Sequence, residues 1–272
     1  MPFFAVKDLS MTFGGLKALD KVSFDIVKGE VFAIIGPNGA GKTTLFNCIN
    51  GIYPPSGGEI LFKDRSIRGL KPDKVAKAGL ARTFQNIELF SNMNTMENIM
   101  IGRHLFMKTG LFRGGLMWGK ASFAGKEEAV NRKKVEEIIE LLELQLFRSK
   151  FVGALPYGIQ KKIELGRALA AEPELLLLDE PCAGMNAEEK QDVIFWIKDI
   201  QDELGITIML IEHDMNMVMD ISDRIIALNF GRQIAMGTPH TVSNHPEVLK
   251  AYLGAEDEDD ASDLAAGEKA TA

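Results

Sequence analysis

Apolar residues fall into short runs separated by polar turns along the N-terminal part of the chain. Phe3–Leu9 and Val22–Val27 alternate between apolar and polar side chains, and residues 28–30 form a turn signal. The next run, Val31–Ile35, is continuously apolar and rich in β-branched residues. Such a run is typical of a strand that is buried on both faces of a sheet. The pattern therefore predicts two half-exposed strands followed by a core strand.

A helical period replaces the alternation in three places. Thr44–Asn50 predicts a helix that ends near Gly51, and Glu188–Leu204 predicts another. Lys126–Leu144 has the strongest period, with Lys and Glu outward. The residues expected to face inward there are Val130, Val135, Ile138, Ile139, Leu142 and Leu144.

Short strands recur before and after the longest helix. They are Glu59–Phe62, Leu175–Leu178, Ile206–Ile211, Arg224–Leu228 and Gln233–Met236. This alternation predicts an α/β core interrupted by a mainly helical insertion at residues 87–165. Within the insertion, Thr109–Gly125 is rich in Gly and aromatic residues and is interpreted as a loop. Its role is left open between a plain connection and a docking surface, because exposed apolar side chains are costly without a partner.

Composition narrows the class of protein. Of 272 residues, 46% are apolar and 25% charged, which is ordinary for a soluble globular protein. No apolar run approaches the roughly 18 residues needed to span a bilayer, and the N-terminus lacks the features of a signal peptide. We therefore expect a cytosolic chain in which Cys48 and Cys182 are reduced, buried thiols.

The net charge of −7 is concentrated at the C-terminus. Residues 255–272 contain seven acidic residues and one lysine, and we expect them to form a disordered acidic tail. Residues 1–254, the predicted folded domain, are close to neutral. This balance counts against a nucleic-acid partner.

One segment carries a specific chemical signal. Gly36–Thr43 matches the pattern GxxxxGK[ST], and it lies between a predicted buried strand and a predicted helix. Its glycines let the backbone N–H groups turn toward phosphate oxygens, and the helix N-terminus adds partial positive charge. Lys42 would contact the β- and γ-phosphates and Thr43 would bind Mg²⁺. The predicted ATP-binding residues here are Gly36, Pro37, Asn38, Gly39, Ala40, Gly41, Lys42, Thr43 and Thr44.

A second acidic signal supports the first. The strand Leu175–Leu178 is followed by Asp179 and Glu180. We expect Asp179 to enter the Mg²⁺ shell and Glu180 to polarise the attacking water.

With these motifs the chain resembles the ABC-type ATPases along nearly its whole length. The resemblance implies a P-loop ABC-type nucleotide-binding domain of the α/β class, with an N-terminal antiparallel β subdomain and an inserted helical subdomain. It also implies roles for three further residues. Phe13 matches the aromatic residue that stacks on adenine. Gln85 matches the glutamine that contacts Mg²⁺ and links the site to a membrane partner. His213 matches the histidine that contacts the γ-phosphate.

The signature motif departs from the LSGGQ of this family. Pro156 stands where Ser is usual, Tyr157 where the first Gly is usual, and Ile159 where Gln is usual. Gly158 and the N-terminus of a predicted helix, Lys161–Ala171, remain to meet phosphate across a dimer interface. Asn186 also replaces a usual Asp. One alternative is that these departures weaken the ATP site. However, LxYGxQ-like versions of the motif resemble a working branch of the family, and this favours an active enzyme.

Six segments narrow the resemblance to importer ATPases for branched-chain amino acids, and to the larger of their two ATPase subunits. They are Arg82–Phe90, Glu180–Asn186, Ile211–Met215, Ile221–Ile225, Gly237–Pro239 and Ala251–Gly254. The resemblance implies a peripheral position on the cytoplasmic face of the inner membrane, two permease subunits, a second ATPase subunit and, indirectly, a substrate-binding protein. A heterodimer is implied, and a homodimer of the isolated chain is left open. The solute also stays open, because importers of urea and short amides are built similarly.

Three other functions compete with the importer. A soluble ABC ATPase acting on DNA or ribosomes predicts tandem ATPase domains or a long coiled coil, and the sequence has neither. A regulatory module without hydrolysis is motivated only by Pro156, Ile159 and Asn186. An exporter of lipid or polysaccharide is a rival within the transporter class.

Overall fold

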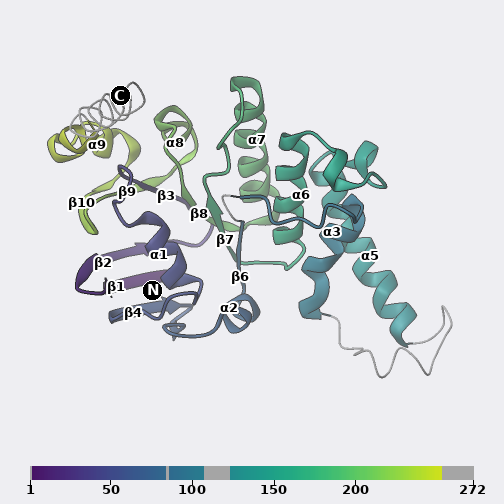
Figure 1. Cartoon of the computed structure of the whole chain (residues 1–272), viewed down its shortest axis with the longest axis horizontal. Coiled ribbons are helices and arrows are strands. Elements are labelled where there is room, and N and C mark those ends of the chain that lie inside the picture. Colours follow the sequence, from purple (N-terminus) through teal and green to yellow (C-terminus); the bar gives the residue numbers. More distant parts are fainter. Residues whose placement is uncertain (1, 84–85, 107–122, 253–272) are drawn as a thin grey trace, which may run out of the picture. The chain divides into compact units, whose positions relative to one another are not determined.

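The computed structural model describes residues 2–83, 86–106 and 123–252 of the chain. It divides into two compact units, which are described separately: Met1–Pro72 with Thr207–Ala272, and Asp73–Ile206 (Figure 1). We call them unit 1 and unit 2. The predicted acidic tail, residues 255–272, lies outside the described residues. Residues 109–122 of the predicted loop also lie outside them.

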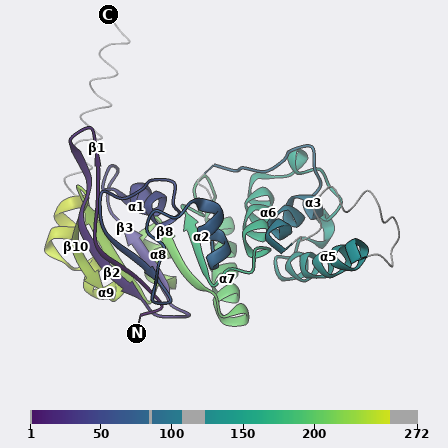
Figure 2. The ribbon, with the colours of Figure 1, turned by 90° about the horizontal axis from the view of Figure 1, so that it is seen from below.

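Unit 1 begins with an antiparallel sheet in the order β2-β1-β4-β5. Its strands are β1 (Phe4–Phe13), β2 (Leu16–Ile26), β4 (Gly57–Phe62) and β5 (Arg65–Ser66). Alternate residues Val22, Phe24 and Ile26 of β2 are buried, as the period of two requires. Phe24 stacks on Phe32 with ring centroids 5.1 Å apart and so joins this sheet to the core strand. The predicted antiparallel β subdomain is confirmed, and Figure 2 shows β1 and β2 as a long strand pair.

The core of unit 1 is a second set of strands in the order β10-β9-β3-β8. They are β10 (Arg232–Gly237), β9 (Arg224–Asn229), β3 (Val31–Ile35) and β8 (Thr207–Ile211). β3 runs parallel to both β8 and β9, and all five of its residues are buried. Helices α1 (Lys42–Ile49), α8 (Met215–Ile221) and α9 (Pro239–Ser243) complete the unit, with a last helical segment at residues 246–252. The carboxyl ends of β3 and β8 meet at one edge, where a ligand site is expected in sheets of this kind.

Unit 2 contains one parallel strand pair and most of the helices. β6 (Leu80–Arg82) pairs with β7 (Leu175–Asp179). The helices are α2 (Pro72–Ala78), which begins at the unit boundary, α3 (Thr95–Ile101), α5 (Phe123–Leu141), α6 (Tyr157–Leu169) and α7 (Ala187–Leu204). Short 3₁₀ turns are η1 (Gly102–Phe106), η2 (Gln145–Phe147) and η3 (Val152–Ala154).

The prediction that Val130 faces inward is wrong. Val130 is 62% exposed, whereas Val135 and Ile139 are buried. The buried face of α5 is set by positions four residues apart, and Asn131 occupies the preceding position on it. Its side-chain oxygen accepts a hydrogen bond from Nε of the buried Arg103. The polar Asn131 is therefore buried, and the apolar Val130, which the sequence pattern favoured, is exposed.

Among the described residues, no helix combines the length and the apolar character needed to cross a membrane. Cys48 and Cys182 are both buried and free, as predicted.

Candidate functional site

The loop Gly36–Thr43 joins β3 to α1 and is closely packed against neighbouring backbone. Gly36 has φ 149°, and a Cβ there would lie 2.2 Å from the carbonyl oxygen of Leu228. A Cβ at Gly41, where φ is 102°, would lie 2.6 Å from the carbonyl oxygen of Ala18. These two positions accept only glycine, for steric as well as backbone reasons. The loop conformation thus follows from the spacing of its glycines.

The start of α1 is suited to bind an anion. Gly41 is the N-cap of the helix and makes no side-chain capping bond. The first turn of a helix has N–H groups without helical partners and carries partial positive charge. A polyphosphate therefore fits the donor set of this loop, as the sequence motif predicts.

Lys42 is drawn back onto the loop. Its side chain is buried, and Nζ donates hydrogen bonds to the carbonyl oxygens of Gly36 at 2.6 Å and Pro37 at 3.0 Å. Thr43, the next residue of α1, is exposed. The ammonium group is thus held at the loop by two neutral acceptors.

His213 and Phe13 also belong to unit 1. His213 follows β8 by two residues, and the parallel pairing of Ile34 with Ile211 places it at the same edge of the sheet as the loop. Its backbone N–H donates to the Glu212 carboxylate at 2.9 Å. Phe13 ends β1, is 40% exposed, and meets Tyr53 edge-on with ring centroids 5.3 Å apart.

In unit 2, Asp179 is the last residue of β7 and does not stand alone. Arg82, the last residue of β6, places Nη2 at 2.6 Å from Oδ2 of Asp179, and both side chains are about 95% buried. Arg82 is a residue of the site that the sequence does not predict, because only the parallel pairing of β6 and β7 brings it to Asp179. The carboxylate suits Mg²⁺ as a hard oxygen ligand.

Glu180 lies at a sharp turn directly after β7. Its φ is 50°, in the left-handed region that non-glycine residues rarely occupy. Such strain is concentrated at functional sites and persists only where the surroundings hold it.

Gln85 lies outside the described residues, but both of its flanks are fixed. The backbone N–H of Thr83 donates to the carbonyl of Leu177 at 2.9 Å. On the other side, the guanidinium of Arg167 donates to the carbonyl oxygen of Glu88. Burial lowers the pKa of Arg167, with Glu164 and Glu88 opposing that shift. The described residues on the two sides of Gln85 are thus bonded to β7 and to α6.

The signature residues lie at the start of a helix. The predicted start at Lys161 is wrong, because α6 begins at Tyr157 with Pro156 as its N-cap. Gly158 is therefore in the first helical turn, where its N–H has no helical acceptor. A Cβ at Gly158 would lie 3.1 Å from the Glu189 carboxylate, so the signature turn also packs against the start of α7.

Asn186 has a structural role at the start of α7. Its side chain accepts hydrogen bonds from the N–H groups of Glu188 and Glu189, and the Glu189 carboxylate accepts from the N–H of Asn186. This capping box starts α7. The pattern Asn-x-x-Glu at residues 186–189 is the sequence signal that could have predicted this helix start.

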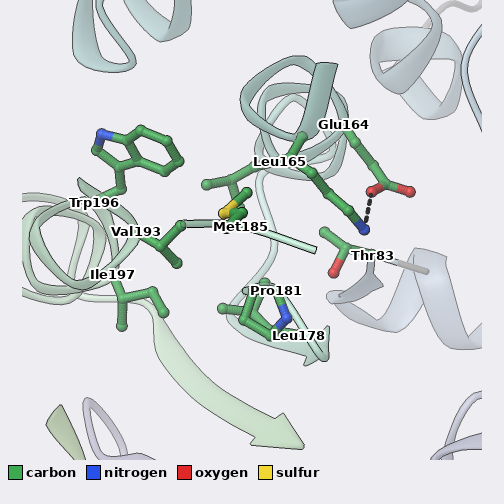
Figure 3. A pocket seen from close by; sticks show the side chains of 10 residues that line it. Thr83, Glu164, Leu165, Leu178, Pro181, Met185, Val193, Trp196 and Ile197 are labelled. Carbon is green, nitrogen blue, oxygen red and sulfur yellow. Dashed lines mark hydrogen bonds and ion pairs between the residues drawn. The ribbon is translucent and has the colours of Figure 1, made fainter. Parts of the chain in front are cut away.

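A small cavity of about 30 Å³ lies where these parts of unit 2 pack together. Figure 3 shows Thr83 beside Glu164 of α6, with Trp196 of α7 across the cavity. Lys161 forms an ion pair with Glu164 at 3.5 Å, and both side chains are buried. The signature helix therefore shares a packed interior with the end of β7 and with the residue that precedes the Gln85 segment.

Comparison with known proteins identifies the family and the relatives of this chain. A family model described as ABC transporter matches residues 19–183, and one described as branched-chain amino acid ATP-binding cassette transporter matches residues 232–258. The high-affinity branched-chain amino acid transport ATP-binding protein LivG of Salmonella typhimurium is 43% identical over 93% of this chain and 98% of its own length. The corresponding protein BraF of Pseudomonas aeruginosa is 41% identical over the same shares.

Solved structures give the same result for the fold. The crystal structure of the ADP conformation of an ATP-binding cassette from an ABC transporter has a TM-score of 0.81 and 31% identity. It covers 93% of this chain and 99% of that one. The nucleotide-free cassette of an ABC transporter has a TM-score of 0.80 with the same identity and coverage.

Proposed function

This chain belongs to the ABC transporter family, and on that premise we propose that it powers the import of branched-chain or related hydrophobic amino acids. As a member of the family it is an ATP-hydrolysing transporter subunit. The observation that carries the proposal is identity of 41–43% over 93% of the chain to ATP-binding proteins of branched-chain amino acid transport. The family model matched at residues 232–258 points to the same solutes.

The proposed phosphate site is the loop Gly36–Thr43 with Thr44. The N–H groups at the start of α1 bind phosphate oxygens. Lys42, held at the loop by the carbonyl oxygens of Gly36 and Pro37, brings its positive charge to oxygens of the β- and γ-phosphates, which are strong acceptors because they are charged. Phe13 stacks on the adenine ring.

Mg²⁺ supplies charge neutralisation on the phosphate oxygens when it is bound. The residues proposed to hold it are Thr43, Gln85 and Asp179. The Asp179 carboxylate already accepts a charged hydrogen bond from Arg82, which fixes its orientation.

Hydrolysis is assigned to two further side chains. Glu180 polarises the attacking water as general base, and His213 contacts the γ-phosphate. The residues Pro156, Tyr157 and Gly158 at the start of α6 would approach the nucleotide of a second ATPase subunit, with the positive end of the helix toward phosphate.

The proposed partners are two membrane permeases, a second ATPase subunit and, indirectly, a substrate-binding protein. These imply a peripheral position on the cytoplasmic face of the inner membrane. We propose that a permease contacts the docking turn, defined as Phe90, Met93 and Phe151 of unit 2. Their side chains are 53%, 38% and 62% exposed, which is costly without a partner.

The docking turn is held in one conformation by Asn98, which is fully buried. Its side-chain oxygen accepts from the N–H of Phe90 at 2.9 Å, and its amide nitrogen donates to the carbonyl of Phe90 at 3.0 Å. Val152 then donates its N–H to the carbonyl of Met93 at 3.1 Å. A preformed apolar surface loses less conformational entropy on binding than a loose one.

The proposal is tested by isolating the chain from solubilised native membranes and identifying the proteins that co-purify. Two permeases, a second ATPase and a binding protein are expected. ATP hydrolysis by the reconstituted complex should rise when that binding protein is loaded with leucine, isoleucine or valine. Stimulation by urea or a short amide alone would contradict the proposed solute, and recovery of only soluble partners from intact complexes would contradict the importer.

A further inference from the structure

The C-terminal helical segment reaches the phosphate-binding loop through one side chain. Tyr252 is the last described residue of the segment 246–252, and its hydroxyl oxygen accepts a hydrogen bond from the backbone N–H of Gly36 at 2.9 Å. The two residues are 216 positions apart. Burial raises the pKa of Tyr252, with the Gly36 bond opposing that shift, so the acceptor is a neutral phenol at physiological pH.

This bond acts on a glycine of the phosphate-binding loop. Gly36 has no side chain, so its φ and ψ angles are freer than those of any other residue type. Its N–H belongs to the peptide plane before its Cα and its carbonyl to the plane after it. Tyr252 holds the first plane, and Lys42 holds the second through the 2.6 Å bond to the Gly36 carbonyl. Together the two contacts fix both angles.

The same geometry connects the tyrosine to the ammonium group. Lys42 Nζ is placed by the carbonyls of Gly36 and Pro37, whose direction depends on the backbone angles of Gly36. We propose that Tyr252 is a positioning residue for nucleotide binding, which sets the Gly36 peptide and through it the loop and Lys42. The inference rests on the phosphate-binding role proposed above for Gly36–Thr43.

Removal of the hydroxyl should reduce affinity without changing the chemistry. A loop that spends part of its time in other conformations binds with an apparent affinity reduced by the competent fraction. One hydrogen bond of ordinary strength corresponds to a factor of about two to ten. We therefore expect weaker binding and a higher KM for ATP, with kcat unchanged.

The test compares the full-length wild type, Tyr252→Phe and Ser243→Ala by titration calorimetry with MgATP and MgADP. Tyr252→Phe removes only the oxygen and keeps the ring. Ser243→Ala removes another hydroxyl of the C-terminal region, one that donates to the carbonyl of His240 in α9. Tyr252→Phe should weaken both nucleotides about two- to tenfold, while Ser243→Ala should bind like the wild type.

The melting temperature measured without nucleotide shows whether Tyr252 positions the loop or only stabilises the fold. A variant that melts lower but binds both nucleotides with wild-type affinity would overturn the inference, and so would wild-type values for both properties. If Tyr252→Phe does not fold, hydrogen exchange on the wild type decides, because the Gly36 N–H should be protected like the amides of β3. Failure of the wild type to bind MgATP would instead overturn the proposed phosphate site.

Discussion

The guanidinium of Arg82 lies 2.6 Å from the carboxylate of Asp179, with both side chains almost fully buried at the ends of two paired strands. The carboxylate expected to serve Mg²⁺ is thus already compensated by a positive charge. A buried pair of this kind is costly to break, because the remaining partner keeps its charge without compensation.

Arg82→Met should therefore lower the free energy of unfolding by about 3–5 kcal/mol. Denaturant unfolding measures the loss. The double variant with Asp179→Asn should regain part of it, because neither charge then remains buried alone. A loss in Arg82→Met below about 1 kcal/mol would show that solvent or another group compensates Asp179.

Glu180→Gln should abolish turnover while nucleotide binding persists. A general base contributes a factor of about 10²–10⁴, so phosphate release should fall by at least about a hundredfold, with affinity for MgATP changed little. Glu59→Gln is the matched control, because Glu59 is an exposed residue of β4 and should retain full activity. Unchanged turnover in Glu180→Gln would contradict the assignment of the base.

Asn186→Ala should destabilise the chain by about 1 kcal/mol, because the capping box of α7 loses its side-chain acceptor. Asn186→Asp retains that acceptor and adds favourable charge at the helix N-terminus. It should therefore unfold at the same or a higher denaturant concentration than the wild type. Equal stability of the Ala and Asp variants would remove the structural explanation for this residue.

Phe151→Ser should weaken assembly with the permeases and leave ATP binding by the isolated chain unchanged. Phe195→Ser is the control, since Phe195 is also 62% exposed but lies on α7, away from the docking turn. Co-purification from membranes measures assembly for both variants. Equal recovery of permeases with Phe151→Ser and the wild type would exclude Phe151 from the interface.

Titration of the Cys48 thiol should make the free energy of unfolding depend on pH in the alkaline range. Burial raises its pKa from 9.0 to about 11. The unfolded chain releases the thiol proton at a lower pH than the folded chain does. The stability that the protonated thiol contributes is complete below pH 9 and is lost as the pH rises through about 11.

The control for this effect is Cys48→Ala, which cannot titrate at that position. The difference in unfolding free energy between wild type and Cys48→Ala should shrink by up to about 3 kcal/mol between those pH values. Urea denaturation at both ends of the range measures it. A difference that stays constant would mean that the folded thiol titrates like a free one.

The core strand and the backbone shape of the phosphate loop could be predicted because they depend on local pattern. Val31–Ile35 is apolar at every position and becomes β3 with the same boundaries. The glycines of Gly36–Thr43 imply a tight turn before a helix, and Gly36 and Gly41 do adopt positive φ. The predicted starts of helices were less accurate, since α6 begins at Tyr157, four residues before the predicted start at Lys161.

The sequence by itself determined the type of site, because glycine spacing, one lysine and two acids after an apolar strand suit few chemistries other than nucleotide hydrolysis. Only the tertiary structure decided which residues support them. Arg82 reaches Asp179 across 97 positions, and Tyr252 reaches Gly36 across 216. Neither contact has a local signal, because a hydrogen bond between distant segments depends on strand pairing and packing rather than on the neighbours of a residue in the chain.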